Sequence, residues 1–142
     1  MAITVEHHVI SAEAAHRAVA AAVEKAEALG IKVNAAVVDA GGNLAAFLRM
    51  PGAFLHSITI AQDKAYSAAG FGMPTHELYR LISTSDALRE SLLQRPRLAA
   101  IGGGLPIEAD GRIVGGIGVS GASEEQDEAC AAAGLMAIGV EI

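Results

Sequence analysis

GGGLPIEADGRIVGGIGVSG, at residues 102–121, is the most informative segment of this chain. Two apolar runs, 105–109 and 112–119, flank the dipeptide Asp110-Gly111, which is typical of the tight turn between antiparallel strands. Glycine and asparagine or aspartate accept the positive φ that such a turn needs. The segment therefore predicts a β-hairpin, and the remaining elements are expected to pack around it.

One face of the second strand of this hairpin is almost bare backbone. Gly116 and Gly118 fall on that face, whereas Ile113, Ile117 and Val119 point to the other. Glycine within a strand is unfavourable and usually marks the close approach of another backbone or of a flat ligand. We expect the alanine-rich helix at the end of the chain to pack there, with a flat ligand as the alternative.

The other elements follow from apolar periodicity and from start and stop signals. Ser11, Thr75 and Ser85 are expected to be helix N-caps, and Ser123 with Gln126 forms a capping box. Helices are expected at 12–29, 57–72, 76–82, 86–94 and 124–138, and strands at 33–39, 43–49, 105–109 and 112–119, with a possible fifth strand at 98–101. Hairpins dominate this order, so residues 1–142 are predicted to form one α+β domain with a central antiparallel sheet of about five strands, flanked by helices.

Composition limits the possible partners. The 142 residues are 52% hydrophobic but only 4% aromatic, and so small a domain hides such an apolar excess poorly, which favours a homo-oligomer. The formal charge is −6 without any basic run, which argues against binding to nucleic acid or to an acidic membrane surface. Cys130 is the single cysteine, expected to be an inert core thiol, and no signal or membrane-spanning segment is found. A cytoplasmic location is therefore expected.

Several residues could hold a ligand. Gly102 to Gly104 offer successive N–H groups for a carboxylate, or form a turn without any ligand. Lys64 shares a helix face with apolar residues, and together with Arg49 and His56 it could clamp a carboxylate-bearing ligand. Solvated surface charge is the alternative interpretation of these three side chains.

The sequence contains five histidines that could bind a metal: His7, His8, His16, His56 and His76. No pair has the spacing of a zinc site. Haem iron needs only one strong protein ligand, so one axial histidine remains possible, and His56 is the candidate. His56 could equally move protons near neutral pH.

Three blocks of the sequence form a recognisable set: VVDAGGNLAAFLRM at 37–50, Asp63-Lys64-Ala65, and residues 102–134. On these blocks the chain resembles the GlcG/HbpS family, which includes the C-terminal domain of PduO-type cobalamin adenosyltransferases. The resemblance implies an α+β fold assembled into dimers, tetramers or octamers. It also implies haem binding in some members, and stand-alone members encoded beside glycolate or aromatic-degradation enzymes. The family motif residues present here are Asp39, Gly41, Gly42, Lys64, Gly102, Gly103, Gly104, Ser120, Gly121 and Asp127.

Three hypotheses follow. In the first, the chain binds haem or a similar carboxylated ligand, with His56 on the iron. The candidate ligand-binding residues are Arg49, Lys64, Gly102, Gly103, Gly104, Asp39 and Ser120. In the second, it is an enzyme acting on a small oxoacid or an aromatic-ring-cleavage product, with Lys64 or His56 as acid/base. In the third, it is a non-catalytic accessory protein of a catabolic operon.

Overall fold

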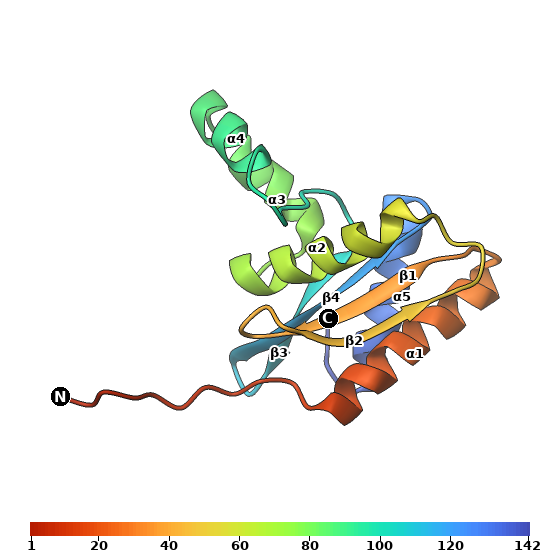
Figure 1. Ribbon diagram of the computed structural model, residues 1–142, viewed down its shortest axis with the longest axis horizontal. Helices are drawn as coiled ribbons and strands as arrows, with labels where there is room; N and C mark the ends of the chain where they lie inside the picture. Colours follow the sequence, from red (N-terminus) through yellow and green to blue (C-terminus); the bar gives the residue numbers. More distant parts are fainter.

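A computed structural model describes residues 1–142 and contains five helices and a four-stranded antiparallel sheet (Figure 1). The helices are α1 (Ala12–Leu29), α2 (His56–Phe71), α3 (Thr75–Ile82), α4 (Asp86–Leu93) and α5 (Glu124–Ala137), and the strands are β1 (Asn34–Asp39), β2 (Leu44–Arg49), β3 (Gly104–Ala109) and β4 (Arg112–Ser120). The predicted α+β class and antiparallel sheet are confirmed.

The two predicted hairpins supply all four strands, in the order β2-β1-β4-β3. β1 and β4 pair antiparallel in the middle, so that Ala36 lies opposite Gly118. At the tip of the second hairpin Asp110 has φ 52° and Gly111 has φ 76°. Two successive left-handed residues are what a two-residue hairpin turn requires, because they match the twist of the strands.

The sheet has four strands and not about five, because residues 98–101 form no strand. The N–H of Ala99 donates to the Ser67 hydroxyl at 2.9 Å instead of to a neighbouring strand. Ala100 packs with Leu78 and Ile82 of α3. The apolar character that suggested a strand is explained by this contact with α3.

The helices cover the sheet on both faces (Figure 1). α1 and α5 lie on one face, and α2 lies on the other. The main core is formed between the sheet and helices α1 and α5, where large strand residues meet small helix residues. Its fully buried members include Ala15, Ala18, Ala22, Ala26, Val33, Ala35, Val37, Ile117, Val119, Cys130 and Ala131.

The glycine face of β4 is covered by α2 and not by the final helix, so that expectation was wrong. A Cβ atom added to Gly118 would lie 2.1 Å from the carbonyl oxygen of Ala61, and one added to Gly116 would lie 2.3 Å from that of Ala65. The α2 backbone thus rests directly on β4 and leaves no space for a flat ligand there. α5 packs on the opposite face, where Gly134 meets Ile117. Both α2 and α5 are rich in alanine, so the size of their side chains could not indicate which of them covers the glycine face.

Most of the predicted helix caps are present. The hydroxyls of Ser11 and Ser85 accept hydrogen bonds from N–H groups three residues on, and Ser123 with Gln126 forms the capping box. Thr75 is an exception, because it lies inside α3 after Pro74. Its hydroxyl instead accepts a 2.8 Å hydrogen bond from the N–H of Gly104, which joins α3 to the start of β3.

α3 and α4 project from the body of the molecule (Figure 1), and α4 has no buried residue. Large apolar side chains stay exposed on this pair of helices, among them Tyr79, Leu81, Leu88 and Leu93. No helix of the chain has the length and apolar character needed to cross a bilayer.

Candidate functional site

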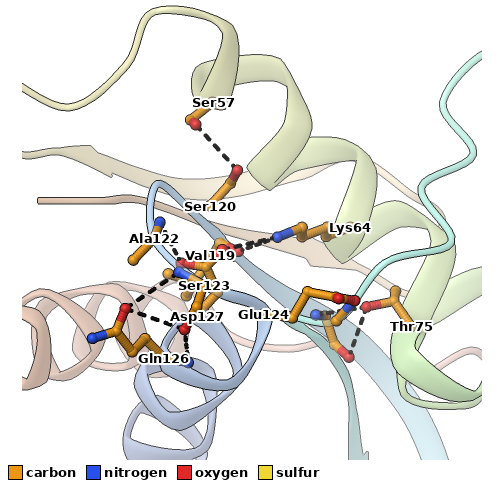
Figure 2. A network of polar contacts seen from close by, with 12 residues as sticks. Ser57, Lys64, Thr75, Val119, Ser120, Ala122, Ser123, Glu124, Gln126 and Asp127 are labelled. Atoms are coloured by element: carbon orange, nitrogen blue, oxygen red, sulfur yellow. Dashed lines mark hydrogen bonds and ion pairs between the residues drawn. The ribbon is translucent and has the colours of Figure 1, made fainter. Parts of the chain in front are cut away.

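Lys64 is at the centre of the polar network that joins the sheet to its helices. Its side chain, only 2% exposed, points from α2 toward the end of β4 (Figure 2). The ammonium donates to the carbonyl oxygen of Val119 at 2.9 Å and to Oδ2 of Asp127 at 3.1 Å. Lys64 therefore links α2, β4 and the first turn of α5.

Burial shapes the charges of this pair. It lowers the pKa of Lys64, and the negative charges of Asp127 and Glu124 oppose that effect. Burial also raises the pKa of Asp127, opposed by the charge of Lys64 and by a 2.9 Å hydrogen bond from the N–H of Ala122. The partners of Lys64 are oxygen atoms in the protein interior. Its ammonium therefore stabilises the fold and is not accessible to a substrate.

The glycine turn lies next to Lys64. Gly103 has φ 125°, and a Cβ added there would lie 2.7 Å from the Lys64 nitrogen. The N–H of Gly102 donates to Oε1 of Glu124 at 2.7 Å, and the N–H of Gly104 donates to Thr75. The N–H of Gly102, one of the groups predicted to bind an external carboxylate, thus already binds the carboxylate of Glu124.

Arg49 and Ser120 lie at one end of the sheet, where Asn34 pairs with both of them. Nη2 of Arg49 donates to the carbonyl oxygen of Ala53 at 2.8 Å. The Ser120 hydroxyl donates to that of Ser57 at 3.2 Å (Figure 2). Between them, Oδ1 of Asn34 is buried without a hydrogen-bond partner. This end of the sheet is polar, with Ser120 buried and Arg49 exposed.

His56 is exposed in the first turn of α2. It follows Phe54 and Leu55, whose apolar side chains are 70% and 71% exposed. Lys64 lies eight residues further along the helix, about 12 Å away at 1.5 Å per residue. The structure thus brings Lys64 to the glycine turn, but it does not bring Lys64 together with His56.

Asp39 closes the hairpin between β1 and β2. Its Oδ1 accepts hydrogen bonds from the N–H of Gly41 at 2.9 Å and from that of Asn43 at 3.0 Å. Slight burial acts to raise the pKa of Asp39, but the hydrogen bonds from Asn43 and Gly41 outweigh it and lower that pKa below 3.8. The geometry assigns this carboxylate to the turn.

The structure contains two hollows that the sequence did not predict; the first lies outside this network, and the second borders it at Gly102 and Glu124. The first, of about 290 Å³, is lined by His8, Val9, Ile10, Ser11, Ala14, Ile107, Ala109, Asp110, Arg112, Val114, Ile138 and Val140. The second, of about 300 Å³, is lined by His76, Gly102, Glu124, Glu125 and Glu128, with His76 paired to Glu128. No group of three or more potential ligands is arranged to hold a metal ion. Both hollows join distant segments, so no local pattern could have revealed them.

Comparison with known proteins agrees with this fold. Residues 10–136 match a family described as haem degrading protein HbpS-like. The chain is 39% identical over 127 residues to the corrinoid adenosyltransferase PduO of Salmonella typhimurium, which covers 88% of this chain but only 38% of PduO. It is 34% identical over 112 residues to protein GlcG of Escherichia coli K12, covering 79% of this chain and 81% of GlcG.

A solved structure gives the same result in three dimensions. The crystal structure of a PduOC:heme complex superposes with a TM-score of 0.85 at 36% identity, covering 94% of this chain and 97% of that one. The family match contains every strand and nearly all of the five helices. The chain belongs to the HbpS-like family.

Proposed function

We propose that this chain binds haem. Two similarities support the proposal: the description of its family as haem degrading, and the haem complex of a structural relative that covers almost the whole chain. The observation on this molecule that carries it is the apolar hollow between the segment before α1 and the tip of the β3–β4 hairpin.

The lining of this hollow suits a flat, dicarboxylate macrocycle. Val9, Ile138 and Val140 offer apolar surface for the ring. Arg112 at the rim can pair with a propionate through two parallel N–H groups. His8 supplies the single strong ligand that haem iron needs.

His56 remains the competing iron ligand. It stands beside the exposed side chains of Phe54 and Leu55, with Arg49 nearby in the sequence. Unlike His8, it lines none of the main hollows of this chain. A haem held by His56 would therefore need a second surface, such as a neighbouring copy of the chain.

Haemin titration separates the two assignments. The protein and five single variants, His7→Ala, His8→Ala, His16→Ala, His56→Ala and His76→Ala, are titrated with haemin while the Soret band is followed. We expect a Soret shift that His8→Ala weakens and the other four leave unchanged. Loss of the shift in His56→Ala alone would support the competing ligand, and no shift in the wild-type protein would refute haem binding.

We also propose that the chain self-associates. The exposed apolar side chains of Tyr79, Leu81, Leu88 and Leu93 lie on the two projecting helices, where a second copy could cover them. Light scattering coupled to size-exclusion chromatography measures the molar mass. A monomer at micromolar concentration would contradict the proposal, whereas a multimer that Leu88→Glu and Leu93→Glu dissociate would support it.

A further inference from the structure

A third hollow, which shares no residue with the hollow proposed for haem, lies between α2 and the segment that leaves α4. It has a volume of about 240 Å³. Its lining is formed by Tyr66, Ser67, Gly70, Phe71, Leu92, Arg95, Pro96, Arg97 and Leu98. The segment after α4 runs back toward α2 and the sheet (Figure 1), so this groove lies at the base of the projecting helices. We propose that the groove binds a small carboxylate with an apolar ring.

The local charge favours an anion. Four of the ten basic residues of the chain, all of them arginines, fall within residues 80–97, against two acidic residues in the same range. This segment carries a charge of +2 in a chain whose formal charge is −6. Two of these arginines, Arg95 and Arg97, line the groove. An anion entering the groove therefore meets a segment of net positive charge in a chain that is otherwise net negative.

Arg97 is held in an unusual position. Its φ of 63° is left-handed, a conformation that non-glycine residues rarely adopt. Ser67 stabilises this turn on both sides, since its hydroxyl donates to the Arg97 carbonyl oxygen at 3.1 Å and accepts from the N–H of Ala99 at 2.9 Å. The result is that the guanidinium lies over the Tyr66 ring, 3.7 Å from its centroid. Stacking on the ring fixes the plane of the guanidinium.

The donors of this guanidinium are largely free. Its ion pair with Asp63 spans 4.0 Å between Nε and Oδ1, which is beyond hydrogen-bond distance. Burial raises the pKa of Asp63, and the charge of Arg97 opposes this effect. A guanidinium has five N–H donors in a planar fork that matches a carboxylate. Arg97 thus has donors to spare for a ligand at the mouth of the groove.

Apolar groups complete the groove opposite the arginines. Phe71 is partly exposed at the end of α2, and Leu92 and Leu98 lie on the other wall. Inorganic phosphate could use the arginines but not this surface, whereas a neutral ring could use the surface but not the charge. A ligand that carries both a ring and a carboxylate uses the whole groove.

Gly70 provides a way to fill the groove without disturbing the fold. A Cβ atom added at Gly70 meets nothing within 4 Å, and the residue does not have a positive φ. Leucine at this position would extend into open space at the groove lining, while alanine would add only the Cβ. Gly70→Leu is therefore the blocking variant, and Gly70→Ala is its smaller counterpart.

The test uses the full chain and isothermal titration with benzoate, benzyl alcohol and inorganic phosphate. We expect benzoate to bind at least about tenfold more tightly than either control ligand, because only benzoate engages both the arginines and the apolar wall. Arg97→Gln and Arg95→Gln should each weaken benzoate binding by about tenfold, and Gly70→Leu should abolish it. Gly70→Ala should weaken it less than Gly70→Leu does, and Arg89→Gln, a change outside the groove, should leave it unchanged.

The contrary outcomes are distinct. Absence of benzoate binding at millimolar concentration overturns the proposal, as does unchanged binding to Gly70→Leu or to Arg97→Gln. Equal affinity for phosphate and benzoate overturns the ligand class, because the apolar wall would then play no part. None of these measurements depends on haem, and all can be repeated in His8→Ala with the same expected result.

Discussion

The ammonium of Lys64 lies 3.1 Å from the Asp127 carboxylate, and neither side chain is more than 3% exposed. Such a pair contributes little net stability compared with apolar residues of the same size, because both charges lose their hydration. Removing one partner is different, since it leaves a buried charge unpaired. The pair is therefore a requirement of the fold at the junction of α2, β4 and α5.

Lys64→Met should lower the free energy of unfolding by about 3–5 kcal/mol, because Asp127 loses its partner. Adding Asp127→Asn to this variant should restore part of the loss, since the double variant buries no charge. Urea denaturation followed by circular dichroism measures both. Unchanged stability of Lys64→Met would contradict the structural role and reopen a catalytic one.

Two glycine-to-alanine changes should have opposite effects. Gly118→Ala should destabilise the protein by more than about 3 kcal/mol, because its Cβ would overlap the Ala61 carbonyl on α2. Gly70→Ala should stabilise it by about 0.5–1 kcal/mol, because the new Cβ meets open space and alanine favours the helix. Urea midpoints compare the pair. Similar midpoints for the two variants would mean that α2 does not rest on β4 as described.

Asp39 should make stability depend on acid pH. Its pKa is lowered below 3.8 in the folded protein by hydrogen bonds from Asn43 and Gly41, which outweigh the effect of slight burial. This stabilisation is fully present above the unfolded value and is lost as the pH falls through the folded one. Asp39→Asn should thus be less stable than wild type at neutral pH, with the difference closing below about pH 3.8. Thermal melts across this range measure it; a constant difference would contradict the assignment.

Cys130 should be inert in the folded protein. It is fully buried in α5, and burial raises its pKa to about 11, with the charge of Asp127 adding to the effect. Because the thiolate is the reactive form, a thiol reagent at neutral pH should label the protein only after denaturant is added. Rapid labelling without denaturant would show that α5 opens readily.

The parts of the fold set by local chemistry were predictable. Asp110-Gly111 fixes its own turn, and Ser123 with Gln126 fixes the start of α5, because each signal acts within a few residues. The helix that covers Gly118 was not predictable in this way. Two alanine-rich helices were equally suitable, and only the path of the whole chain decides between them.

The candidate site, like the fold, could be predicted only where the signal was local. Lys64 was recognised as an ammonium on an apolar helix face, but its partner Asp127 lies 63 residues away and no spacing rule connects them. Arg97 gave no signal at all, since its left-handed backbone is imposed by contacts with Ser67. The hollow beside His8 likewise depends on Arg112 of β4, which is distant from His8 in the sequence.

The contact of α2 with β4 has a consequence for how this protein can change. Where a helix touches a strand through main chain alone, there is no layer of side chains that could be exchanged for others of different shape. Gly118 can gain a side chain only if α2 and β4 move apart, which would open the network around Lys64 as well. New binding properties in this scaffold should therefore arise by changes at its periphery, in the N-terminal segment and the projecting helices, while the contact between α2 and β4 stays fixed.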